Sequence, residues 1–90
     1  MMARPERRIS AAGPVAEFAT GLRELRRRAG VTYRDMEEIV YYVHDVLSRA
    51  ADGRKLPTWE VTYAYVFACG GDAVEWWERW EAARTAETEQ

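Results

Sequence analysis

The sequence has too few sulfur- and imidazole-bearing side chains for a cross-linked scaffold. Its 90 residues include one cysteine, Cys69, and one histidine, His44. A single cysteine cannot form an internal disulfide, and these two residues cannot supply the four ligands of a structural zinc site. A disulfide scaffold and a zinc finger are therefore excluded, and Cys69 is expected to be a small buried apolar residue.

Long apolar runs are also missing. The longest mostly apolar stretch, residues 61–69, is far short of the roughly 20 residues that a bilayer span needs. The first eight residues carry charge, but no apolar run of about 7–15 residues follows them, so we expect no secretory signal. We expect a cytoplasmic protein that does not bind a membrane.

The residue sets that enzymes use are absent as well. With one histidine, one cysteine and no glycine-rich phosphate loop, the chain offers no nucleophile–base pair and no set of metal ligands. We therefore expect no catalytic residues, no metal site and no cofactor.

What is present suits one small domain with an uneven charge. Hydrophobic residues make up 48% of the chain and charged residues 31%, which is unlike the composition of disordered proteins. The net charge of −2 divides into +5 for residues 1–34, −2 for residues 35–59 and −5 for residues 60–90. Because charges act over about 10 Å in salt, the near-neutral total does not exclude a nucleic-acid partner.

Helix signals predict five short helices in one domain, residues 14–84. Residues 1–13 show no hydrophobic period and are expected to form a flexible basic arm, and residues 85–90 are expected to fray. The first helix begins at Pro14 and ends before Gly30, the second follows Thr32, the third runs from about Val43 to Ala51, the fourth from Trp59 to Cys69, and the fifth follows Asp72.

Apolar spacing and helix caps support this division. Thr32 with Asp35 is close to a capping box, and Gly30 suits the position just after a helix. The predicted buried faces are Val15, Phe18, Leu22 and Leu25 in the first helix, Met36, Ile39 and Val40 in the second, and Ala73, Trp76, Trp77, Trp80 and Ala83 in the fifth.

Segments spread over residues 14–84 match one family pattern. They are Gly21–Arg26, Thr32–Arg34, Leu47–Ala50 and Asp52–Arg54, followed by Leu56–Val61 and Ala68–Asp72 with the tryptophans of the last helix behind them. Together they resemble the Cro/repressor-like helix-turn-helix (XRE) family, in the version common in actinobacteria. The resemblance implies an all-α, five-helix fold whose third helix enters the major groove of DNA.

The resemblance also implies a role for each matching position. Leu47 would anchor the third helix, and its base-reading residues would be His44, Asp45 and Arg49. The residues near phosphates would be Thr32, Tyr33, Arg34, Ser48, Arg54 and Lys55. Arginine can donate two hydrogen bonds to guanine, and helix N-termini favour phosphate. The implied function is a sequence-specific transcriptional regulator that binds double-stranded DNA as a homodimer.

Departures from the family pattern leave a second function open. Tyr41 and Val43 stand where members usually have the glycine of the turn and the serine cap, so either the turn is rebuilt or the two helices are partly fused. Acidic residues also lie near the reading helix: Glu37, Glu38, Asp45 and Asp52. The alternative is a protein-interaction module on a degenerate helix-turn-helix fold, which binds a protein partner or a second copy through exposed aromatic residues. These are Tyr41, Tyr42, Tyr63, Phe67 and Trp77.

Overall fold

The structure is a computed structural model that describes residues 6, 8–9 and 12–89 of the chain. Within these residues it contains five helices and no strand, which confirms the predicted all-α fold. The helices are α1 (Pro14–Ala29), α2 (Tyr33–Glu37), α3 (His44–Ala50), α4 (Trp59–Ala68) and α5 (Ala73–Thr88). None of the described helices has both the length and the apolar character needed to cross a membrane.

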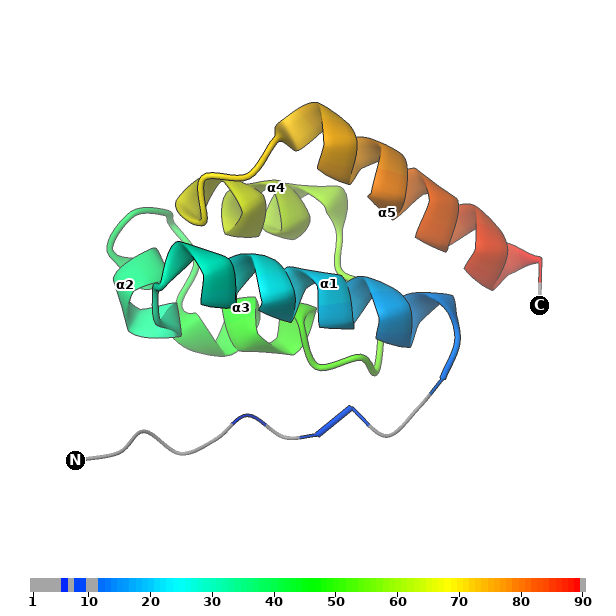
Figure 1. Ribbon diagram of the computed structural model, residues 1–90, viewed down its shortest axis with the longest axis horizontal. Coiled ribbons are helices and arrows are strands. Elements are labelled where there is room, and N and C mark those ends of the chain that lie inside the picture. Colours follow the sequence, from blue (N-terminus) through cyan, green and yellow to red (C-terminus); the bar gives the residue numbers. More distant parts are fainter. Residues whose placement is uncertain (1–5, 7, 10–11, 90) are drawn as a thin grey trace.

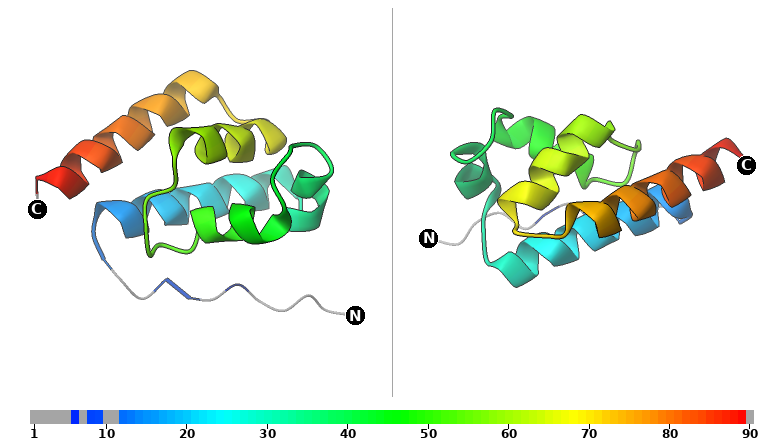
Figure 2. Two further views of the ribbon diagram at one scale, coloured as in Figure 1. Left: turned by 180° about the vertical axis from the view of Figure 1, so that it is seen from behind. Right: turned by 90° about the horizontal axis from the view of Figure 1, so that it is seen from above.

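The two long helices, α1 and α5, form the framework of the domain. α5 packs along α1, and α4 packs against α5 and α3 (Figures 1 and 2). α2 and α3 contact each other at the end of the domain where α1 finishes. The buried core lies between these helices and includes Leu22, Met36, Leu47, Tyr65 and Trp76.

A close approach of α1 to α5 depends on a glycine. The rings of Phe18 and Trp76 meet edge to face with their centroids 5.6 Å apart, and the guanidinium of Arg79 lies 3.9 Å from the centroid of Trp76. A Cβ atom at Gly21 would lie 2.5 Å from Arg79 Nη2. Gly21 therefore gives the arginine room to stack on the buried tryptophan.

The helix ends follow the local sequence signals. Gly30 adopts the left-handed conformation after α1, with φ of 70°. Thr32 and Asp35 form the predicted capping box, in which each side chain accepts from the other residue's backbone N–H. These hydrogen bonds lower the pKa of Asp35 below its ordinary value. Asp72 caps α5 by accepting from the backbone of Val74 and Glu75.

The predicted extent of the second helix was wrong. α2 ends at Glu37, so Ile39 lies beyond the helix and is 52% exposed instead of buried. α5 extends to Thr88, past the residue at which we expect fraying to begin, and the Thr88 hydroxyl donates to the carbonyl of Arg84. At the end of α4, Cys69 is the C-cap residue. It is buried as expected, and burial raises the pKa of its thiol to about 11.

The connection between α2 and α3 is a rebuilt turn, not a fusion of the two helices. Tyr41 is fully exposed in it, and no described residue other than glycine has a positive φ. Val43 offers no side-chain cap to α3. Instead, Glu37 Oε2 accepts a hydrogen bond of 2.7 Å from the backbone N–H of His44. A carboxylate from α2 therefore replaces the missing serine cap.

We expect Trp76→Ala to lower the free energy of unfolding by about 3–5 kcal/mol, because it removes a buried ring from the junction of α1 and α5. Val74→Ala on the same helix alters a side chain that is largely exposed and should change stability by less than about 0.5 kcal/mol. Urea unfolding followed by circular dichroism measures both values. Similar losses in the two variants would contradict this account of the core.

We expect Glu37→Gln to lower stability at neutral pH and to lose that effect in acid. The hydrogen bonds from the His44 backbone and ring hold the pKa of Glu37 below its ordinary value of 4.5. A depressed pKa in the folded state stabilises the protein above 4.5, and this contribution disappears as the pH falls through the folded-state pKa. The stability difference between wild type and variant should therefore shrink from pH 7 to about pH 3. Glu38→Gln, at the exposed next residue, should show no such convergence in the same urea series.

Candidate nucleic-acid interface

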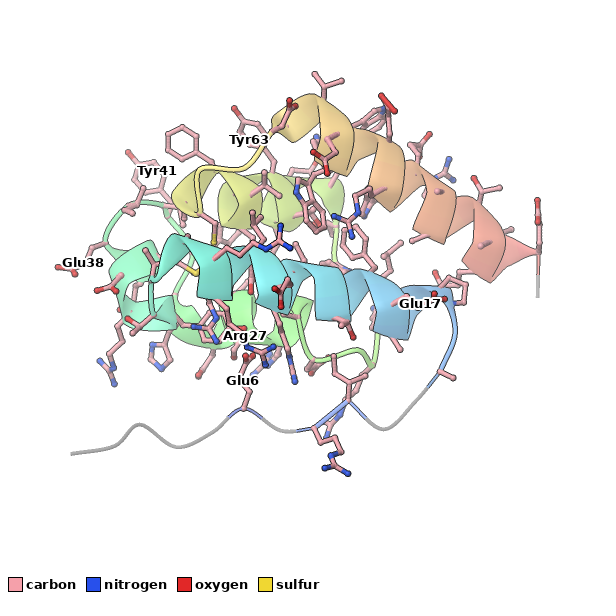
Figure 3. All side chains as sticks on the ribbon, in the orientation of Figure 1. Glu6, Glu17, Arg27, Glu38, Tyr41 and Tyr63 are labelled. Carbon is pink, nitrogen blue, oxygen red and sulfur yellow. The ribbon has the colours of Figure 1, made fainter. Side chains whose placement is uncertain are left out.

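Residues of α2 and α3 line a groove of about 820 Å³ together with Glu6 and Arg23. Figure 3 shows Glu6 on the side of α1 on which α3 lies. The groove contains the three predicted base-reading residues and three of the six predicted phosphate residues. Its full lining is Glu6, Arg23, Tyr33, Arg34, His44, Asp45, Ser48, Arg49 and Asp52. The fold therefore places predicted base-reading residues of α3 and predicted phosphate residues of α2 and α3 in one groove.

The other predicted phosphate residues lie outside this groove. Arg54 and Lys55 are exposed and line a neighbouring groove of about 500 Å³, which shares Arg49 and Asp52 with the first. Thr32 is exposed at the start of α2, where its hydroxyl accepts from the backbone of Asp35. The cationic side chains Arg49, Arg54 and Lys55 thus extend from the last turn of α3 into the connector beyond it.

The imidazole of His44 lies between two carboxylates, those of Glu37 and Asp45. His44 Nδ1 lies 3.0 Å from Glu37 Oε2, and His44 Nε2 lies 3.3 Å from Asp45 Oδ1. An imidazole with a carboxylate at each nitrogen has no free nitrogen for a base edge. Because Asp45 is exposed, a change of its rotamer would release both side chains.

The N-terminal segment contributes an acidic residue to the groove that sequence analysis did not identify. Glu6 Oε1 accepts a 2.8 Å hydrogen bond from Arg26 Nη2, and Glu6 Oε2 accepts one of 2.5 Å from the Tyr33 hydroxyl. Arg23 Nε lies 3.2 Å from the same Oε2. We call Glu6, Arg23, Arg26 and Tyr33 the Glu6 cluster. Figure 3 shows the Glu6 side chain directed from the segment toward the helices.

Burial and hydrogen bonding to Glu6 shift the pKa values of two donors of the Glu6 cluster, Arg26 and Tyr33. Burial opposes the charge of Arg26, but hydrogen bonding to Glu6 and the nearby Tyr33 raise its pKa overall. The pKa of Tyr33 is raised by burial first and by its hydrogen bond to Glu6 second. The Arg26 guanidinium lies 4.5 Å from the centre of the Tyr33 ring. No short-range signal predicts this cluster, because Glu6 lies 17 residues or more from each partner.

The charges that line the main groove are balanced. Three arginines, Arg23, Arg34 and Arg49, face three carboxylates, Glu6, Asp45 and Asp52. The other acidic residues that the sequence places near α3 have different positions. Glu37 caps α3, and Glu38 is exposed at the edge of the molecule (Figure 3). Their charges therefore do not line the groove.

A row of aromatic side chains lies on α4 and α5, away from the groove. Tyr63, Phe67 and Trp77 are 47%, 60% and 42% exposed. Trp59 links the row, with its ring centroid 6.0 Å from that of Tyr63 and 5.0 Å from that of Trp77. We call these four residues the aromatic row. Of the other predicted aromatics, Tyr41 is exposed in the turn before α3, and Tyr42 is partly buried against the core.

Comparison with known proteins identifies the family of the chain. A family model described as a helix-turn-helix domain matches residues 17–75, which is more than half of the chain and runs from α1 into α5. Searches of curated proteins and of solved structures found no match. Helix-turn-helix domains are DNA-binding in general and typically not enzymes. The matched residues contain both α3 and the groove residues of α2, so this chain belongs to the helix-turn-helix domain family.

Proposed function

We propose that this protein is a sequence-specific DNA-binding transcriptional regulator of the repressor-like (XRE) class, in which α3 enters the major groove. The observation that carries the proposal is the common groove lined by α2 and α3, where all three base-reading candidates lie beside Tyr33, Arg34 and Ser48. In helix-turn-helix complexes the second helix of the motif reads base edges while the first crosses the backbone.

The residues in and beside the groove suit different contacts with DNA. Arg49 is exposed on α3 and can donate two hydrogen bonds to O6 and N7 of a guanine. Asp45 can accept from the N4 amino group of cytosine, and His44 can donate or accept once it leaves Asp45. Arg34, Arg54 and Lys55 are exposed at helix ends or in the connector, where they suit phosphate contacts.

The proposal includes a homodimer and a location with the chromosomal DNA of the cytoplasm. Helix-turn-helix dimers bind two half-sites about 34–36 Å apart, one turn of DNA. Two copies of α3 at that spacing would double the bases read without enlarging the domain. Sedimentation equilibrium with and without an operator-length duplex measures the number of chains in each state.

We expect Arg49→Ala and Lys55→Ala to affect DNA binding in different ways. Loss of a guanine contact should cost about 1–3 kcal/mol at one base pair and relax the preference there, whereas loss of a phosphate contact should weaken all sequences alike. Duplexes obtained by selection from a random pool, and their single-base variants, can be compared by fluorescence anisotropy. With about six phosphate contacts, log K should fall against log salt with a slope near −5.

Arg84→Ala is the matched control for this experiment. It removes the same charge from α5, where Arg84 pairs with Glu81 at 2.7 Å, and it should leave the base preference unchanged. If Arg49→Ala and Lys55→Ala weaken every duplex equally, Arg49 is not a base reader. If wild type binds no duplex even at about 50 mM salt, the proposed function is wrong.

The aromatic row favours a second candidate function, a protein-interaction module on the same fold. Exposed aromatic side chains are enriched in protein interfaces and carry much of their binding energy. The partner would be another protein or a second copy of this chain. This function does not require the α3 groove, because the row lies on α4 and α5.

We expect Phe67→Ala to abolish partner binding if the second candidate is correct, because Phe67 is the most exposed member of the aromatic row. Co-purification from the native host and sedimentation equilibrium measure a foreign partner and a second copy. Val74→Ala, which shortens an exposed apolar side chain on α5, is the control. The second candidate is rejected if Phe67→Ala retains every partner and the oligomeric state of wild type.

A further inference from the structure

In the Glu6 cluster, side chains of α1 and α2 form an anion-binding site that is occupied by the carboxylate of Glu6 from the same chain. Two guanidinium groups from α1 and one hydroxyl from α2 converge on a single carboxylate, at distances of 2.5–3.2 Å. The side chains of Arg23 and Arg26 are only 8% and 17% exposed. Each guanidinium also donates to a backbone carbonyl of the domain, Arg23 Nε to Ala51 and Arg26 Nη1 to Val31, so both arginines have partners besides Glu6.

The same donors suit a phosphate. Arginine forks and hydroxyl groups recognise carboxylate and phosphate oxygens with similar geometry. While Glu6 occupies the site, one buried donor, Arg26 Nε, has no acceptor. An anion with more oxygen atoms than a carboxylate can satisfy this N–H as well. The chemistry therefore admits a phosphate in place of Glu6.

The site also lies where a DNA backbone would pass. Glu6, Arg23 and Tyr33 line the same groove as His44, Asp45 and Arg49. Ile9 lies on the same side of the domain, against the loop after α3. A Cβ atom at Gly53 would lie 2.9 Å from Ile9 Cγ2. Glu6 and Ile9 therefore both lie beside the proposed reading surface.

We propose that Glu6 is an autoinhibitory residue that competes with a DNA phosphate for the site formed by Arg23, Arg26 and Tyr33. This inference rests on the proposed DNA-binding function. With Glu6 in place, the charges lining the groove are balanced. When Glu6 leaves, one negative charge is removed from the groove, and the donors that Glu6 held, Arg26 Nη2 and the Tyr33 hydroxyl, can turn to a DNA phosphate. Arg23, whose Nε–H donates to the carbonyl of Ala51, adds its positive charge. DNA binding and release of Glu6 are therefore coupled.

Glu6→Gln tests the competition directly. The amide keeps the size of the side chain but loses the charge that holds the two guanidinium groups. We expect the variant to bind duplex DNA about tenfold more tightly than wild type at low salt, because the DNA phosphate no longer has to displace a carboxylate from the site. Circular dichroism and thermal unfolding should show that the variant retains the fold.

Glu78→Gln is the matched control, because it makes the same charge change on α5. Glu78 is exposed, and α5 lies on the opposite side of α1 from Glu6 (Figure 3). A gain due only to net charge would appear in both variants. Equal gains, or no gain for Glu6→Gln, would overturn the proposed competition.

Inorganic phosphate tests the anion site without DNA. Nuclear magnetic resonance can follow the Nε–Hε signals of Arg23 and Arg26 during a phosphate titration, and Glu6→Gln should respond at about tenfold lower phosphate than wild type or Glu78→Gln. Failure of all three proteins to bind any duplex, with this phosphate response intact, would reject the proposed function but retain the anion site. If the three proteins respond alike to phosphate, the anion site is rejected.

Discussion

The burial of one charged side chain, Arg23, constrains how α1, α3 and the N-terminal segment lie together. A buried guanidinium is tolerated only when its donors are satisfied, since an unpaired buried charge costs several kcal/mol. Arg23 is 7% exposed, and its Nε donates to the carbonyl of Ala51, at the end of α3, over 2.7 Å. The same nitrogen lies near Glu6. The positions of α3 and of Glu6 relative to α1 thus depend on one residue of α1.

The turn before α3 shows how one acidic residue serves the fold as a helix cap. Val43 cannot cap α3, and an uncapped N-terminus leaves backbone donors without partners. Glu37 supplies the acceptor from α2 and thereby fixes the distance between the two helices of the motif. A carboxylate at a helix N-terminus is also stabilised by the helix dipole. The negative charge of Glu37 is thus a structural part of the motif, in the place that a neutral hydroxyl usually takes.

Local chemistry explains why most of the fold could be predicted and part of the site could not. Thr32, Gly30 and Asp72 act within a few residues of their own position, so the sequence alone predicts the helix ends that they produce. Ile39 was misplaced because apolar spacing continued past the end of a five-residue helix. Glu6 and Arg23 depend on contacts between distant segments, and a glutamate in a basic stretch gives no sign of its partner. The predicted reading residues of α3 were found together because one helix carries all of them.

The uneven distribution of charge would orient the protein as it approaches DNA in the proposed binding mode. Residues 60–90, which form α4 and α5, carry a net charge of −5, and residues 1–34 carry +5. α5 lies on the opposite side of α1 from α3 and Glu6 (Figures 1 and 3). Such a charge asymmetry turns the protein as it approaches a polyanion, so that the negative end points away from the phosphates. The acidic residues of α5 lie far from the groove and would help to orient the groove toward the duplex. For this reason, the net charge of −2 opposes the proposed DNA binding less than its sign alone suggests.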